Sequence, residues 1–212
     1  PGSELVLLIR PGKRSTVAQR ARREIFRNDA FDHLRAELGK DELDHAVERR
    51  VQVIAGDVGT DGLGLDDAGR AVLASCDIVV HSAATVAFDS PLDAAVEVNL
   101  LGPSRIALTL HDVGVTPHFV AVSTCYVAGN RRGAAPEQPV HESPFFVDVD
   151  WRGEVDGARR ARQDAEAESR TPEALQRFRS QARRELGAAG TPALAAKTEQ
   201  RRQVWVKERM VA

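Results

Sequence analysis

Two hydroxyl side chains, Ser123 and Thr124, stand at the end of a short apolar run and are the residues best suited to act on a carbonyl group. A hydroxyl at the carboxyl end of a strand can donate to a substrate carbonyl oxygen and stabilise the charge that develops as hydride arrives. Thr124 is the better placed of the two. The alternative is that both hydroxyls only bond the backbone of a turn. No arrangement of His, Asp or Asn around Cys125 indicates a reactive thiolate.

Basic and acidic residues end two earlier apolar runs, where a dinucleotide could bind. Arg10 ends the first run and Lys13 follows it, and such cations can hold the 2′-phosphate of NADPH through charge-assisted hydrogen bonds. Asp57 ends the second run and could accept from an adenine amino group, while the backbone of Val58 bonds a ring nitrogen. The alternatives are a solvated basic loop at Arg10 and a turn capped by Asp57.

Small residues follow the third run, at Ser82, Ala83 and Ala84. They would let the ribose and diphosphate of a cofactor approach the backbone closely, although ordinary tight packing explains them equally well. We interpret His81 as a core histidine, because no second His or Cys lies at metal-ligand spacing, and no metal site is expected. Asn99 is expected to face the core, where its amide would hold a water molecule, the backbone or a purely structural partner.

The apolar runs that would position these residues alternate with helical patterns. Strands are predicted at residues 4–9, 51–55, 77–81 and 119–123, and helices at 15–38, 66–74 and 91–112. Such alternation predicts right-handed crossovers and a Rossmann-like parallel α/β sheet with flanking helices. In these sheets ligands bind outside the carboxyl ends of the strands, which is where all the candidate residues above lie.

Composition narrows the class of protein. The chain has 212 residues, of which 42% are hydrophobic and 28% charged, and its net charge is −2. A globular domain with a closed core is expected, and disordered and collagen-like chains are excluded. Two cysteines are too few for a disulfide scaffold and favour the reducing cytoplasm. The near-neutral charge argues against nucleic acid as a partner.

Charge divides the chain near Trp151. Residues 1–151 carry 15 Lys and Arg against 22 Asp and Glu, a net charge of −7, whereas residues 152–212 carry 14 against 9, a net charge of +5. We predict a partial NADP-binding domain at 1–151 and a basic helical insertion at 152–212, with helices at about 171–186 and 193–212. The insertion could be a lid over acyl-CoA phosphates, a membrane-contacting surface, or a solvated face with Glu–Arg pairs.

Taken together, the strand ends resemble a known family. The motifs are LLIRP at 7–11, GDV at 56–58, HSAATVAFD at 81–89, VNLLG at 98–102 and VSTCYVAGN at 122–130. Across residues 4–142 they resemble the extended short-chain dehydrogenase/reductase superfamily, and within it the fatty acyl-CoA reductases with their male-sterility NAD(P)-binding domain. The block at 81–89 is the most specific of these motifs.

The resemblance implies an NADPH-dependent oxidoreductase of lipid metabolism that reduces a fatty acyl-CoA, or another acyl thioester, to an aldehyde or onward to an alcohol. It would place Arg10 at the 2′-phosphate, and Asp57 and Val58 at adenine. Ser82, Ala83 and Ala84 would line the ribose and diphosphate. Thr124, or else Ser123, would be the Ser/Thr of the catalytic set. A cytoplasmic protein is expected, with peripheral membrane contact as an option.

The chain also departs from the family pattern. The Gly-rich turn that follows the family's first strand would precede Pro1, and Asn130 stands where a Tyr-x-x-x-Lys motif starting at Tyr126 needs Lys. The general-acid Tyr and its Lys are therefore expected beyond Ala212. We predict an internal piece of a reductase that is inactive alone. The alternatives are a nucleotide-sugar epimerase or dehydratase, and a non-catalytic cofactor-binding Rossmann protein.

Overall fold

The computed structural model describes residues 2–12, 14–87, 89–125, 127–128, 132–187 and 190–211. Lys13 and Tyr126, which the sequence analysis singled out, lie outside these ranges. The chain divides into two compact units. The first, here called the sheet unit, comprises residues 1–83 and 100–122, and the second, the helical unit, comprises 84–99 and 123–212. The predicted domain boundary coincides with the start of α7 at Trp151, and the assignment of 1–151 and 152–212 stays a prediction.

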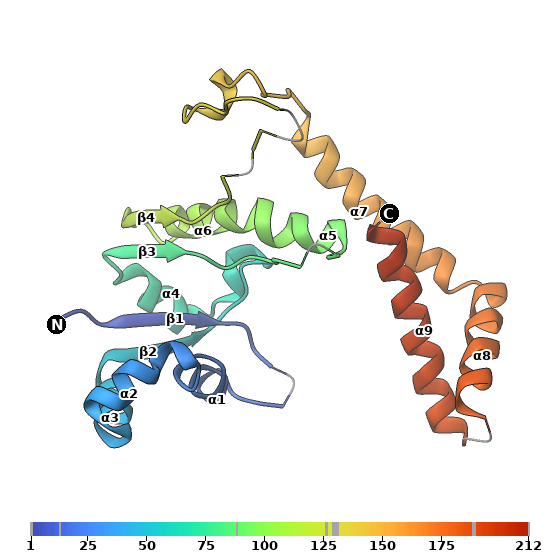
Figure 1. The fold of residues 1–212 in the computed structure, drawn as a ribbon, viewed down its shortest axis with the longest axis horizontal. Helices are drawn as coiled ribbons and strands as arrows, with labels where there is room; N and C mark the ends of the chain where they lie inside the picture. The colour runs from blue at the N-terminus through green and yellow to red at the C-terminus, as the bar shows by residue number, and fades with distance from the viewer. Residues whose placement is uncertain are drawn as a thin grey trace. The chain divides into compact units, whose positions relative to one another are not determined.

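Four short strands form the sheet unit, close to the predicted positions: β1 (Leu5–Ile9), β2 (Val51–Ala55), β3 (Ile78–His81) and β4 (His118–Ala121). β1 pairs in parallel with β2, and β3 pairs in parallel with β4. Among the described residues, β1 and β3 are not paired with each other. In Figure 1 the strands lie in the order β4, β3, β1, β2 and point the same way.

One hydrophobic core serves both strand pairs. Its buried members are Ile54, Leu63, Leu65, Leu73, Ile106 and Leu110. Val6 and Leu8 of β1 pack against it together with Val79 of β3 and Phe119 of β4. The α/β fold predicted from alternation is therefore confirmed, and the expected single sheet is present as two parallel pairs on a shared core.

Helices form the connections between the strands of the sheet unit. Between β1 and β2 the predicted single helix is divided into α1 (Val17–Arg20), a π-helical turn (Ala21–Phe26), a 3-10 turn (Asp29–Phe31) and α2 (Asp32–Leu38). Asn28 causes one interruption, because its side chain accepts from Ala30 N and caps a new start. Gly39, with φ +78°, ends α2, and the unpredicted α3 (Lys40–Arg50) follows.

The other crossovers agree better with the sequence. α4 (Asp67–Ala74) begins at Asp66, whose side chain accepts from Gly69 N. The long helix predicted after β3 is a succession of α5 (Leu92–Ala95), a π-helical turn (Val96–Leu100) and α6 (Leu101–Asp112). A π-helical turn inside a helix often marks a functional position, and this one contains Asn99.

Three long helices dominate the helical unit: α7 (Trp151–Ser169), α8 (Pro172–Leu186) and α9 (Thr191–Val211). α9 packs against both α7 and α8, as Figure 1 shows in orange and red. Thr171 caps α8 by accepting from Ala174 N, with Pro172 in the first turn, close to the predicted start of this helix at about residue 171. α7 was not predicted as a separate helix. Phe178, Ala182 and Val206 are almost completely buried between these helices.

A buried arginine joins α7 to α9. The Arg202 guanidinium donates to both carboxylate oxygens of Glu199, at 2.8 and 2.7 Å, and to Glu166 Oε2 and Ser169 Oγ on α7 at 2.5 and 2.9 Å. The Arg202 side chain is 6% exposed. A desolvated guanidinium needs such partners, and here they satisfy most of its donors.

This cluster makes the helical unit sensitive to acid. Hydrogen bonds from Arg202 lower the pKa of Glu199 from 4.5 to about 2. Because the folded state holds the carboxylate more strongly than the unfolded state, the stabilisation is complete above about pH 5 and is lost as the pH falls towards 2. We expect urea midpoints, followed by circular dichroism at 222 nm, to fall across this window, and to fall less in Glu199→Gln. Identical pH profiles for the two proteins would contradict this.

Candidate functional site

The ends of β1 and β2 bring the predicted cofactor residue Arg10 next to Gly56, the residue that precedes Asp57. Ile9 pairs with Ala55, and Gly56 N donates to Ile9 O at 3.2 Å, so that Arg10 and Gly56 both follow paired strand ends. The Arg10 side chain is exposed, and its carbonyl oxygen accepts from the Arg20 guanidinium. The backbone of β1 is therefore tied to the helix that follows it just where a phosphate-binding cation is predicted.

Asp57 caps a turn, as the alternative interpretation allowed. Its Oδ1 accepts from Gly59 N at 2.9 Å, and its own N–H donates to Leu63 O at 2.8 Å. Gly56 is required at the approach to this turn, because a Cβ there would lie 2.9 Å from Leu63 O and 2.9 Å from Leu8 Cδ1. Val58 packs against the core. The turn is thus a compact, rigid element at the strand edge.

An ion pair that the sequence analysis missed anchors the same loop. Arg105 of α6, itself 8% exposed, donates to Asp61 Oδ1 at 2.7 Å. Asp61 begins the 3-10 turn Asp61–Gly64, which ends the loop that carries Asp57. The two residues are 44 positions apart, so no local pattern in the sequence could have paired them.

The end of β3 presents small, exposed residues. Ser82, Ala83 and Ala84 are all exposed, which leaves their backbone accessible to a bound molecule. His81 before them is 6% exposed, and burial lowers its pKa, which suits the predicted core histidine. Ser82 and Ala83 belong to the sheet unit with Arg10, whereas Ala84 is the first residue of the helical unit.

Asn99 holds the segment that follows these small residues. Its Oδ1 accepts from Thr85 N at 2.7 Å, and its Nδ2 donates to Thr85 O at 2.9 Å. The predicted core position is wrong, because Asn99 is exposed. The predicted contact with the backbone is present, because the side-chain amide of Asn99 has one acceptor and one donor that bond the N–H and the C=O of Thr85.

Removing this amide is expected to loosen the segment. Asn99→Ala deletes both hydrogen bonds to Thr85, each worth about 1 kcal/mol, and should accelerate hydrogen exchange at the Thr85 amide by about 5- to 30-fold. Asn99→Asp keeps an acceptor for the N–H but sets a carboxylate against the carbonyl, so an intermediate effect is expected. Exchange mass spectrometry of a peptide spanning 82–87 measures this, with β1 and β2 peptides as unaffected references. Unchanged exchange in Asn99→Ala would show that the amide does not hold the segment.

The candidate catalytic hydroxyls follow β4. The strand ends at Ala121, two residues before the predicted end, so Ser123 and Thr124 lie in the segment beyond it. Both are exposed, and both belong to the helical unit. The structure therefore gathers Arg10, Asp57, Ser82 and Ala83 in one unit at the carboxyl ends of strands. Ser123 and Thr124 follow Val122 directly in the sequence but belong to the helical unit.

Two further features bear on function. Within the described residues, no group of three His, Cys, Asp or Glu side chains is placed to hold a metal ion. No helix of the described chain is long and apolar enough to cross a membrane.

Comparisons with known proteins point in one direction. Residues 1–185 match the model of the male sterility protein family, an NAD-binding domain family. Fatty acyl-CoA reductase 8 of Arabidopsis thaliana is 32% identical over 139 residues, covering 65% of this chain and 28% of that protein. The alcohol-forming fatty acyl-CoA reductase of Simmondsia chinensis is 30% identical over 140 residues, again covering 65% of this chain and 28% of that protein.

A solved structure is similar as well. The terminal R domain from the myxalamid PKS-NRPS biosynthetic pathway has a TM-score of 0.43 and 20% sequence identity, over 77% of this chain and 46% of that one. The chain spans 22–28% of the length of the curated relatives it matches.

Proposed function

The chain belongs to the male sterility protein family of NAD-binding domains, and from this premise we propose that it is part of an NADPH-dependent reductase acting on a fatty acyl-CoA or a related acyl thioester. The observation that carries the proposal is the family match across residues 1–185, together with relatives that are named fatty acyl-CoA reductases. The product is a fatty aldehyde or the corresponding alcohol, and the proposed compartment is the cytoplasm, with peripheral membrane contact.

The sheet unit would bind the adenosine half of the cofactor. Arg10 would contact the 2′-phosphate from the end of β1, with Lys13 beside it in the sequence. Asp57 has one carboxylate oxygen bonded to Gly59 N, and its other oxygen would accept from the adenine amino group beside Val58. Ser82, Ala83 and the adjoining Ala84 of the helical unit are small and exposed, and they would line the ribose and diphosphate.

Thr124 would act on the substrate. When bound, the reduced nicotinamide supplies the hydride that reaches the thioester carbonyl carbon. The Thr124 hydroxyl would donate to the carbonyl oxygen, which gains negative charge as the hydride arrives, and Ser123 is the second candidate for this role. Collapse of the tetrahedral adduct then releases the coenzyme A thiolate and leaves the aldehyde.

The test is a reductase assay on the full open reading frame that contains these residues. NADPH consumption at 340 nm with palmitoyl-CoA, and identification of hexadecanal or hexadecanol by gas chromatography, would support the proposal. NADH in place of NADPH should support a clearly slower reaction if Arg10 reads the 2′-phosphate. Turnover of UDP-galactose with no acyl-CoA reduction would contradict the proposal and favour a nucleotide-sugar enzyme.

A further inference from the structure

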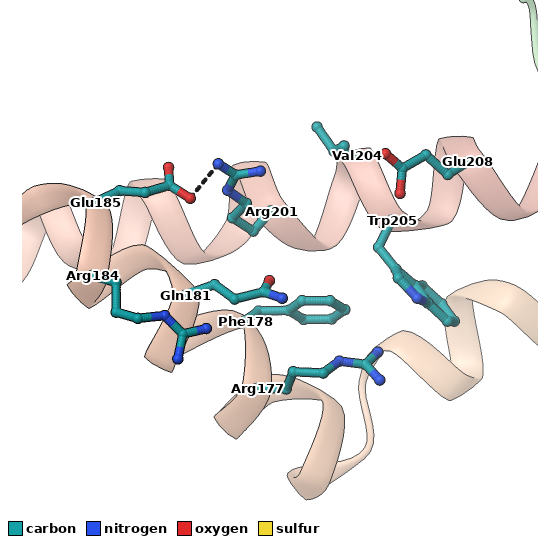
Figure 2. Close-up of a pocket in the computed structure, with 9 residues that line it drawn as sticks. All are labelled: Arg177, Phe178, Gln181, Arg184, Glu185, Arg201, Val204, Trp205 and Glu208. Atoms are coloured by element: carbon teal, nitrogen blue, oxygen red, sulfur yellow. Dashed lines mark ion pairs between the residues drawn. The ribbon is translucent and has the colours of Figure 1, made fainter.

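A pocket of about 330 Å³ lies between α8 and α9, outside every residue discussed so far as a cofactor or catalytic group. Figure 2 shows that its lining has two different ends. Arg184 and Arg201 lie at one end, and Val204, Trp205 and Glu208 lie at the other. This volume is at the lower bound of small-molecule sites in proteins.

The arginine end has unused hydrogen-bond donors. Arg184 is exposed, and it makes no ion pair with any residue that the structure describes. Arg201 pairs with Glu185 through one terminal nitrogen, while its Nε is buried without a hydrogen-bond partner in the described chain. Arg201 lines the pocket and uses only one terminal nitrogen for Glu185, so its guanidinium can also donate to an oxygen of a bound anion.

The aromatic end consists of the Phe178 and Trp205 rings, and the Arg209 guanidinium lies 5.6 Å from the Trp205 ring centroid. The rings of Phe178 and Trp205 have centroids 5.9 Å apart and are tilted by 55°. The guanidinium of Arg177 lies 5.1 Å from the Phe178 ring centroid and 5.6 Å from that of Trp205. Trp205 is only half-buried, and the neighbouring Glu208 brings a carboxylate to the same end, where it can accept from an exocyclic amino group.

We propose that this pocket binds the phosphorylated adenosine of coenzyme A, with adenine against Trp205 and its amino group towards Glu208. The phosphates would then lie at Arg184 and Arg201, and the carboxylate of Glu208 stays at the opposite end from them. A flat base with an amino group matches the end with Trp205 and Glu208, and a doubly phosphorylated ribose matches the end with Arg184 and Arg201. The choice of coenzyme A among adenine nucleotides rests on the proposed acyl-CoA substrate.

The test titrates the 212-residue chain with adenosine 3′,5′-bisphosphate and follows Trp205 fluorescence in a Trp151→Phe background, which leaves one emitting tryptophan. We expect saturable binding with a Kd of roughly 10 µM to 1 mM. Arg184→Gln should weaken binding by about tenfold, because a charge-assisted hydrogen bond to phosphate is lost. Arg179→Gln is the matched control: Arg179 is exposed on the same helix but does not line the pocket, and binding should change less than about twofold.

Several results would overturn the assignment. One is that Trp205 fluorescence shows no saturable change up to millimolar bisphosphate, although circular dichroism shows that the helices are intact. Another is that Arg184→Gln and Arg179→Gln weaken bisphosphate binding equally. A third is that unphosphorylated adenosine binds as tightly as the bisphosphate. Inorganic phosphate should compete weakly, and phosphate that competes as well as the bisphosphate would reduce the pocket to an anion site and also overturn the proposal.

This titration contains no reductant, so its failure and the failure of the proposed reaction are distinguishable. Bisphosphate binding by a protein whose full reading frame does not reduce acyl-CoA would contradict only the reaction. An active reductase whose KM for acyl-CoA is the same with Arg184→Gln would contradict only the pocket.

Discussion

Arg202→Ala is expected to lower the free energy of unfolding of the helical unit by about 2–3 kcal/mol. Removing one partner of a fully buried ion pair typically costs somewhat more, but the Glu166 and Glu199 side chains are 29% and 47% exposed and can recover some solvation. The loss has two sources, the guanidinium bonds between α7 and α9 and the polar groups left without them, including Ser169 Oγ.

The matched control contacts the same carboxylate. Arg170 lies 3.4 Å from Glu166 Oε2, but its side chain is 64% exposed, so Arg170→Ala should cost less than about 0.5 kcal/mol. Urea unfolding followed at 222 nm and by Trp205 fluorescence would report both variants, analysed as separate transitions if the two units unfold separately. Equal effects of Arg202→Ala and Arg170→Ala would show that the buried cluster does not join the helices.

Thr124→Val is expected to reduce kcat for acyl-CoA reduction by about 100- to 1,000-fold in the full reading frame. The hydroxyl is proposed to bond the carbonyl oxygen most strongly when that oxygen is negatively charged, and losing one such donor has this typical cost. Because valine keeps the shape of threonine, KM should change little, which is the pattern of an interaction made in the transition state.

Ser123→Ala separates the two candidate hydroxyls. If Thr124 is the donor, Ser123→Ala should retain kcat within about threefold, since an adjacent exposed hydroxyl contributes little on its own. The reverse result, a large loss in Ser123→Ala and a small one in Thr124→Val, would transfer the role to Ser123. Small losses in both variants would remove this pair from the catalytic set.

Local patterns were enough to predict much of the sheet unit. The four parallel strands are short apolar runs, and each was recognisable because polar or turn-forming residues such as Gly56 and Asp57 end them. The starts of α4 and α8 were predicted at residue 66 and at about residue 171, next to the caps at Asp66 and Thr171 that the structure shows. Family membership followed from the order of the strand-end motifs and is confirmed by the family match.

Where the helices between β1 and β2 were misread, the cause was a local signal given too little weight. The helix predicted across 15–38 is interrupted by a cap at Asn28, and α3 follows a glycine in the left-handed region at Gly39. Asn99 was assigned to the core because its neighbours are apolar, but the π-helical turn around it changes which residues share a face. The roles of Arg10, Asp57 and the other site residues stay predictions.

What the chain determined by itself is therefore the four strands, their order and the residues at their ends, because these depend on patterns within a few positions. Only the tertiary structure decided how distant polar groups are satisfied. Arg105 reaches Asp61 across 44 residues, and Arg202 reaches Glu166 across 36. Such pairs form because a guanidinium removed from water must find acceptors wherever packing places them, and packing is a property of the whole fold.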